Sequence, residues 1–151
     1  MKKITLLIAL AIVVTACGGK KENNESVKAT DQITYYLAVK DALVLTDGAK
    51  AQSAAKAFLN TSENVSLKSD LEMIAGTSDV KVQRQAFEAL SMKMYDLVQA
   101  SGSDSPLYKQ YCPMAFNNKG AYWLATEMEV NNPYFGDKML HCGSVQEKVG
   151  G

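Results

Sequence analysis

Soft metal donors gather in two short segments near the end of this chain, Cys-Pro-Met at residues 112–114 and Met-Leu-His-Cys at residues 139–142. The candidate ligands are Cys112, Met114, Met139, His141 and Cys142. Thiolate, thioether and imidazole groups together favour Cu(I), because soft sulfur donors select soft metal ions. Two cysteines with one histidine also suit Zn(II), but methionine is a poor zinc ligand and the spacing is not that of a zinc finger. The pattern therefore predicts a soft-metal site, with copper preferred over zinc.

The backbone around each segment determines which donors can meet. The intervening proline fixes its own φ and biases Cys112 away from the helical conformation, so an extended segment would place Cys112 and Met114 on one face. Met139 and Cys142 are three residues apart and would lie together on a helical turn. If that segment is extended instead, Met139 and His141 share a face. In either geometry each segment offers two donors to a single point.

The same two cysteines could instead form a structural disulfide. A Cys112–Cys142 bridge would close a loop of about 30 residues and stabilise the fold by about 3.5 kcal/mol through the lost chain entropy. Paired cysteines are common in secreted proteins, whereas a purely structural bridge needs no flanking methionines. The two interpretations are compatible if the reduced pair binds copper and the oxidised pair does not.

The N-terminus carries the features of a bacterial secretion signal. Lys2 and Lys3 precede an apolar run over residues 4–14, which is too short to span a bilayer as a mature helix. The Thr-Ala-Cys that follows resembles a lipobox. It implies a signal peptide over residues 1–16, cleavage before Cys17 and attachment of diacylglycerol to the sulfur of Cys17. Several acyl chains anchor a protein stably, so we expect a lipoprotein on the periplasmic or outer face of a bacterial membrane.

The composition after cleavage excludes one class of partner. Loss of Lys2 and Lys3 changes the formal net charge from 0 to −2, which gives no electrostatic footprint for nucleic acid. With Cys17 lipidated, two cysteines remain in an oxidising compartment. Residues 17–29 then form the lipidated cysteine and a polar, flexible tether. The remaining length suits one domain over residues 30–148.

Residues 30–100 contain no proline and show helical periodicity throughout. Apolar side chains recur every three or four residues, and polar breaks such as Asp47-Gly48 separate the apolar stretches. These stretches lie at residues 33–44, 51–59, 67–74 and 83–97. Four amphipathic helices joined by short polar turns predict a mainly α fold, an up-and-down helical bundle.

Residues 102–148 differ in kind, because they contain all 3 prolines and most of the aromatic residues. Helical periodicity fades there, and short strands are expected at residues 107–111 and 143–148. We expect an irregular, aromatic-rich C-terminal lobe that packs on the bundle. This lobe also contains every candidate metal ligand named above.

Several segments together resemble an uncharacterised bacterial domain. They are residues 35–43, 83–91, 107–115, 118–124, 132–139 and 142–143. This domain occurs as a stand-alone secreted or lipid-anchored protein, and as a C-terminal appendage of periplasmic adaptors of heavy-metal and copper efflux pumps. The resemblance covers residues 31–148 and implies components of a metal efflux system as partners. Among the candidate ligands, the residues shared in the resemblance are the four sulfur-containing ones, Cys112, Met114, Met139 and Cys142, rather than His141.

The residues predict binding rather than catalysis. Cys112 and His141 could form a nucleophile–base pair, but the chain has one histidine, no evident group to orient it, and no paired-carboxylate or glycine-rich phosphate motif. We therefore expect no enzyme, but a membrane-anchored lipoprotein that binds Cu(I) in metal resistance or trafficking. The alternative is a disulfide-stapled interaction module without metal, with Trp123, Tyr134 and Phe135 as exposed anchors.

Overall fold

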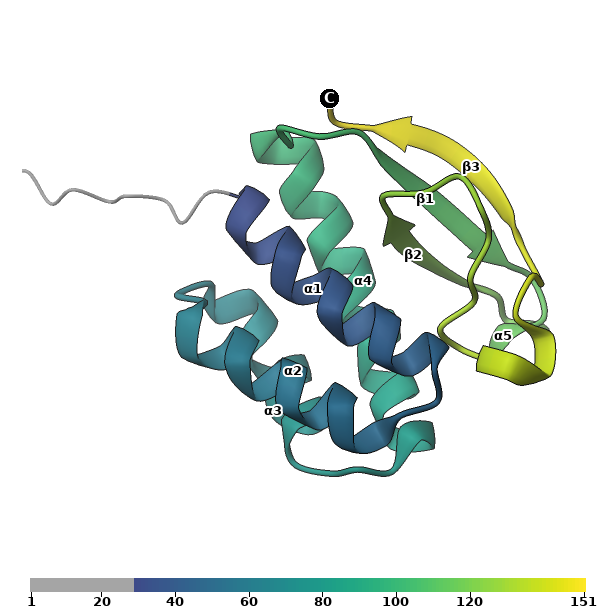
Figure 1. Ribbon diagram of the computed structural model, residues 1–151. Helices are drawn as coiled ribbons and strands as arrows, with labels where there is room; N and C mark the ends of the chain where they lie inside the picture. Colours follow the sequence, from purple (N-terminus) through teal and green to yellow (C-terminus); the bar gives the residue numbers. More distant parts are fainter. Residues whose placement is uncertain (1–28) are drawn as a thin grey trace, which may run out of the picture.

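The computed structural model describes residues 29–151. The predicted signal peptide at residues 1–16, the lipidation site Cys17 and the tether up to residue 28 lie outside these residues. Within the described part of the chain, no helix is both long and apolar enough to span a bilayer. Four helices come first, and a small antiparallel sheet follows them (Figure 1).

The four helices pack side by side as a bundle. They are α1 (Ala29–Val44), α2 (Gly48–Thr61), α3 (Val65–Ala75) and α4 (Val80–Ser101). Each helix packs against the next along the chain, and α4 returns to pack against α1. The side chain of Asp47 accepts the N–H of Lys50 at the start of α2, and Asp79 accepts that of Lys81 at the start of α4. These caps satisfy N–H groups that lack a partner in the first helical turn. The predicted mainly helical fold is confirmed.

The apolar stripes of the four helices meet in the core of the bundle. Their buried side chains include Tyr36, Leu43, Phe58, Leu71, Ile74, Phe87, Leu90 and Met94. One polar residue shares the stripe of α4. Gln83 is fully buried, and its Nε2 donates to the carbonyls of Gly48 at 2.9 Å and Thr77 at 2.7 Å. This amide ties the start of α2 and the turn before α4 to the core.

Three antiparallel strands form the sheet of the C-terminal lobe. They are β1 (Leu107–Cys112), β2 (Ala121–Ala125) and β3 (Ser144–Val149), in the spatial order β2-β1-β3. A short turn labelled α5 (Ala115–Asn118), in which Phe116 and Asn117 have positive φ values of 51° and 57°, joins β1 to β2. A 3₁₀ helix η1 (Gly136–Met139) precedes β3. The strands predicted at residues 107–111 and 143–148 are confirmed to within a residue. No strand was predicted at the position of β2.

The segment over residues 126–143, which joins β2 to β3, connects the sheet to the bundle. On the sheet side, Nε2 of Gln110 donates to the carbonyl of Glu127 at 2.9 Å. On the bundle side, Nε of Arg84 donates to the carbonyl of Pro133 at 2.7 Å. The second group of candidate metal ligands therefore lies on a segment that contacts both regions.

Aromatic rings from both regions form one continuous cluster. Phe87 of α4 stacks on Tyr36 of α1 with ring centroids 5.3 Å apart, and it also meets Tyr134 at 5.9 Å. Tyr134 in turn contacts Phe116 at 5.3 Å and Trp123 at 5.9 Å. The cluster joins the core of the bundle to the core of the lobe.

This cluster overturns one expectation about the aromatic residues. Trp123 and Tyr134 were expected as exposed anchors, but they are only 1% and 7% exposed. The expectation is wrong because Tyr134 lies at the centre of the cluster and Trp123 packs against it. Phe135, the third residue, is half-buried.

Candidate functional site

The two candidate segments meet at their cysteines. The Sγ atoms of Cys112 and Cys142 lie 3.1 Å apart. Cys112 ends β1 and is fully buried, whereas Cys142 lies just before β3 and is half-buried. Two sulfur atoms that lie 30 residues apart along the chain are thus in direct contact, one beneath the surface and one at it.

Asn132 positions the segment that carries Cys142. This side chain is fully buried, and its Nδ2 donates to the carbonyl of Cys142 at 2.7 Å. Its Oδ1 accepts the N–H groups of Tyr134 at 2.8 Å and Phe135 at 3.2 Å. Buried backbone groups require hydrogen-bond partners, and here a single side-chain amide is the partner of three of them. The position of the Cys142 sulfur therefore depends on Asn132.

Gly143 allows the chain to pass close to β1 directly after Cys142. Its φ of +145° is rarely adopted by residues with a side chain. A Cβ at this position would lie 2.7 Å from the carbonyl oxygen of Tyr111 and 3.1 Å from the ring of Trp123. The contact between the two sulfurs therefore requires a glycine next to Cys142.

The two methionines are placed differently from one another. Cys142 donates its N–H to the carbonyl of Met139 at 3.0 Å, so these two residues share the predicted helical turn. Met114 does not share a face with Cys112, because the chain turns after β1: Met114 has φ −89° and ψ −10°, and it is 47% exposed. The expectation of an extended segment is wrong, since the fixed φ of proline suits a turn as well as a strand.

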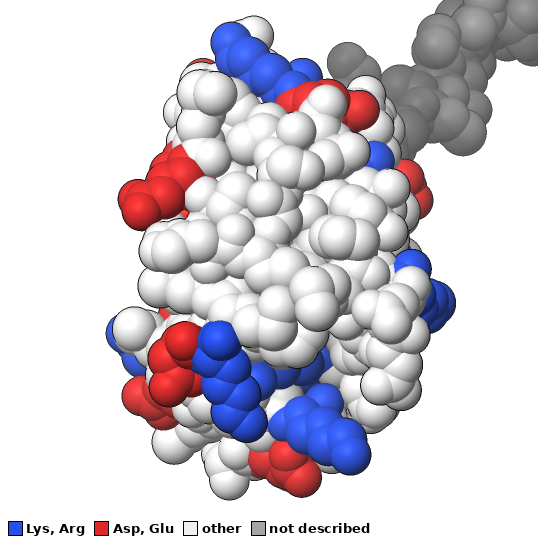
Figure 2. Space-filling view, turned by 90° about the vertical axis from the view of Figure 1, so that its right-hand side faces the viewer, with Lys and Arg blue, Asp and Glu red and all other residues white. Residues whose placement is uncertain are grey.

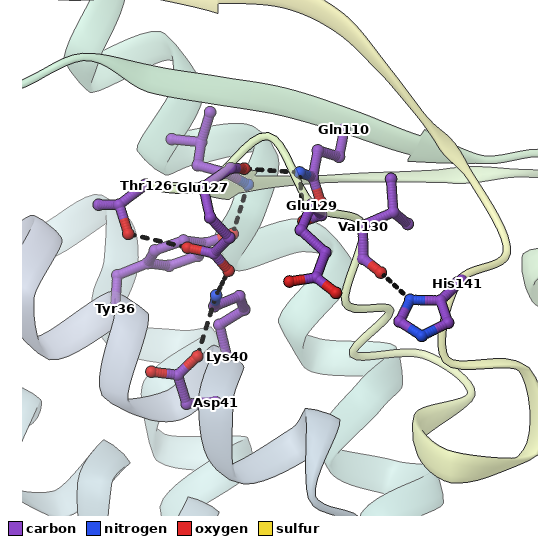
Figure 3. A network of polar contacts seen from close by, with 10 residues as sticks. Tyr36, Lys40, Asp41, Gln110, Thr126, Glu127, Glu129, Val130 and His141 are labelled. Carbon is purple, nitrogen blue, oxygen red and sulfur yellow. Dashed lines mark hydrogen bonds and ion pairs between the residues drawn. The ribbon is translucent and has the colours of Figure 1, made fainter.

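His141 does not join the two cysteines as a third donor. The residue is exposed, and its Nδ1 lies 2.8 Å from the carbonyl oxygen of Val130 (Figure 3). Across residues 29–151, no three His, Cys, Asp or Glu side chains are grouped so that they could hold a metal ion. The structure therefore brings Cys112 and Cys142 together without a third donor of these types.

The thiol of Cys142 resists ionisation. The hydrogen bond with Cys112, burial and the charge of Cys112 together raise the pKa of Cys142 to about 11. At neutral pH this thiol is protonated, and a protonated thiol is a weak nucleophile. A metal ion would have to displace the proton, so that its binding would weaken as the pH falls.

An ion pair between the buried Lys40 and the start of the 126–143 segment was not predicted from the sequence. The Nζ of Lys40 is bonded to Glu127 at 2.7 Å and to Asp41 at 2.9 Å, and the Lys40 side chain is 2% exposed (Figure 3). The sequence does carry a sign that Lys40 is buried. Lys40 follows Tyr36 by four residues and precedes Leu43 by three, so it lies within the apolar stripe of α1. The ion pair attaches the start of the 126–143 segment to α1. Neither of its residues is close to Cys112 or Cys142 in sequence.

The family comparison covers the helices of the bundle but neither of the two cysteines. Residues 33–106 match the family described as "Protein of unknown function (DUF3347)" and so carry a domain of unknown function. The match begins within α1 and ends one residue before β1, so both Cys112 and Cys142 lie beyond it. No curated protein and no solved structure shows significant similarity to the chain.

Proposed function

We propose that this protein is a lipid-anchored protein of the bacterial cell envelope that binds Cu(I) through Cys112 and Cys142, in metal resistance or trafficking. The observation that carries the proposal is the contact between the two sulfur atoms at 3.1 Å. Two adjacent thiolates form a soft donor pair, and soft donors select Cu(I) over harder ions. The burial of Cys112 would shield the bound ion from water on one side.

Binding of an ion would require a small opening of the pair. Metal–sulfur bonds of about 2.3 Å at a trigonal angle place two sulfurs about 4 Å apart. Cys142 is the sulfur that can move, because it is half-buried on a turn, whereas Cys112 is fixed in β1. Met139 and Met114 lie within three residues of the thiols, and their flexible thioethers are candidates for a third ligand.

The surroundings of the site support binding rather than catalysis. The raised pKa of Cys142 disfavours a reactive thiolate, and the ring of His141 is engaged with the Val130 carbonyl. The resemblance of residues 31–148 to an appendage of copper efflux adaptors supports components of a metal efflux system as partners. Lipidation of Cys17 would place the site at the membrane face where such components lie.

Anaerobic titration of the reduced full chain with Cu(I), in competition with a chelator, tests the proposal. We expect one ion per chain, and we expect the double change Cys112→Ser with Cys142→Ser to abolish uptake. Met73→Ser with Met92→Ser, two exposed helical methionines, is the matched control and retains it. His141→Ala also retains it. Undiminished uptake by the double cysteine variant would show that the proposed site is wrong.

The same distance favours a second candidate, a disulfide-stapled interaction module of the envelope that binds no metal. A Cys112–Cys142 bridge would stabilise the native state by about 3.5 kcal/mol. Alkylation of the natively purified chain followed by mass measurement distinguishes the two candidates. The module predicts no free thiol in the native protein, a lower unfolding temperature after reduction, and no Cu(I) uptake by the reduced chain. Uptake on reduction supports the copper site instead.

A further inference from the structure

A pocket with a volume of about 570 Å³ opens beside the first turns of α4. Its other walls come from α5 and from the part of the 126–143 segment around η1. This volume lies in the range of ligand-binding pockets. No cysteine lines the pocket, so any ligand it binds is separate from the thiol site.

The pocket carries an excess of positive charge. Lys81, Arg84 and Lys138 line it, and neither lysine takes part in an ion pair within residues 29–151. Arg84 donates to the carbonyls of Pro133 and Leu43, and these neutral partners do not cancel its positive charge. Asp137 is the carboxylate near Arg84. Figure 2 shows Lys and Arg side chains at the lower end of the face that carries β3 and η1, with Asp and Glu side chains beside them, below a broad uncharged area.

Aromatic and amide groups complete the lining. The half-buried rings of Phe116 and Phe135 face the pocket, and Phe116 is braced by the ring of Tyr134 at 5.3 Å. Gln85 and Asn117 add exposed side-chain amides, which can both donate to and accept from a peptide main chain. Cations, aromatic rings and amides together match a peptide that combines carboxylates with an apolar side chain.

The pocket lies far from the point where the tether joins the domain. Gly136, beside the pocket, approaches the carbonyl of Val44 at the end of α1, whereas the described chain starts at Ala29, at the opposite end of the same helix (Figure 1). A 16-residue helix separates these points by about 20 Å. This placement favours a ligand presented by a partner protein over the bilayer to which the tether leads.

We propose that this pocket binds an acidic peptide segment with an aromatic residue, presented by a partner protein. The carboxylates pair with Lys81 and Lys138 at the rim, and the aromatic side chain packs on Phe116 and Phe135. The proposal goes beyond metal binding and does not depend on it, and only the preference for a partner protein over the bilayer rests on the proposed lipid anchor. Because rim charges act through electrostatic attraction, the affinity should fall as the salt concentration rises.

Fluorescence anisotropy with the full chain in detergent tests the proposal. The probe is a labelled peptide, Glu-Phe-Glu-Glu-Phe-Glu, with one control peptide in which Ser replaces Phe and another in which Lys replaces Glu. We expect the first peptide to bind and both controls to bind more weakly. The double change Lys81→Glu with Lys138→Glu should lower the affinity about tenfold. Both lysines are exposed, and a glutamate in the first turn of α4 favours the helix, so the variant should fold.

Charge reversal at a distance from the pocket provides the matched control. Lys56→Glu with Lys148→Glu changes the net charge equally at two exposed positions outside the pocket, and we expect it to leave the affinity within about twofold. Equal binding of the basic peptide, equal binding of the serine peptide, an equal loss of affinity in both charge variants, or no binding of any peptide would each overturn the proposal.

Discussion

The helical bundle and the C-terminal lobe satisfy their backbone groups in different ways. In α1 to α4 the helices supply most of the bonds, and side chains such as Asp47 and Asp79 act at the helix ends. In the 126–143 segment, carbonyl groups are bonded by side chains, of which Gln110 and Arg84 lie outside the segment and Asn132 and His141 lie within it. These bonds are Gln110 to Glu127 and Glu129, Asn132 to Cys142, Arg84 to Pro133 and His141 to Val130. The candidate metal site lies in the region that depends on such single contacts.

This difference predicts two kinds of sensitivity to mutation. Loss of volume in the bundle leaves a cavity, whose cost grows with its size. Loss of a polar side chain in the lobe leaves buried backbone groups without partners, which costs the desolvation energy of each group. The aromatic cluster is the place where the two regions share a core, so it tests whether they unfold together.

Phe87→Ala should have the largest effect. The ring is fully buried between Tyr36 and Tyr134, so its removal should lower the free energy of unfolding by about 3–5 kcal/mol. Trp123, the 1 tryptophan of the chain, reports on the lobe by fluorescence, and far-ultraviolet circular dichroism reports on the helices. We expect both denaturant midpoints to shift together.

A surface change provides the control for this experiment. Met73 is 52% exposed, and Met73→Ala should change the free energy of unfolding by less than about 0.5 kcal/mol. If Phe87→Ala shifts the circular dichroism midpoint while the Trp123 fluorescence midpoint stays in place, the bundle and the lobe are separate cooperative units. The shared aromatic core would then not couple them.

Local signals in the sequence determined the helices and their ends. The apolar spacing within each helix and caps such as Asp79 depend on residues a few positions apart, so they can be recognised before the fold is known. The turn from Met139 to Cys142 is local in the same way and was one of the two geometries expected for that segment. Lys40 shows the limit of this reasoning. Its position in the stripe of α1 indicated burial, but its charge indicated exposure, and its partner Glu127 lies 87 residues away.

The lobe was harder to predict because its structure depends on distant contacts. β2 lacks an alternating pattern, since four of its five residues are buried, and periodicity alone does not identify such a strand. The turn after Cys112 was missed because proline fits both a turn and a strand. The sequence selected Cys112 and Cys142 as a pair, but only the folded chain gives the 3.1 Å between them.

Asn132→Ala tests the dependence of the lobe on single polar contacts. Its loss removes the partner of the Cys142 carbonyl and of two N–H groups, which should lower the free energy of unfolding by about 2–3 kcal/mol. It should also increase the reaction of Cys142 with an alkylating reagent in the reduced protein, because the turn that carries this thiol loosens. Denaturant titration and timed alkylation with mass detection measure the two effects.

The neighbouring residue offers a matched control. Asn131 is half-buried, and Asn131→Ala should alter stability by less than about 0.5 kcal/mol and leave the alkylation rate unchanged. Equal effects of the two changes would mean that the amide contacts of Asn132 do not organise the lobe. The contrast with the bundle would then rest on packing alone.

The ion pair between Lys40 and Glu127 should have the smallest effect, and it depends on pH. Burial raises the pKa of Glu127, but hydrogen bonds from Lys40 and Thr126 and the charge of Lys40 outweigh burial and lower the pKa below its ordinary value of 4.5. In the unfolded chain this carboxylate takes up a proton at a higher pH than in the folded protein. Its contribution to stability is therefore complete above the ordinary pKa and is lost as the pH falls through the folded value.

Comparison of the native chain with Glu127→Gln checks this sign. We expect the variant to be less stable by about 0.5–1 kcal/mol at neutral pH, because the carboxylate is 34% exposed and Asp41 still neutralises Lys40. The difference should shrink steadily as the pH is lowered to about 3. Glu129→Gln, which replaces an exposed carboxylate on the same segment, is the control, and it should change the stability at neutral pH by less than about 0.5 kcal/mol. A difference that grows in acid would mean that the Lys40–Glu127 pair does not attach the lobe to α1 in the folded state.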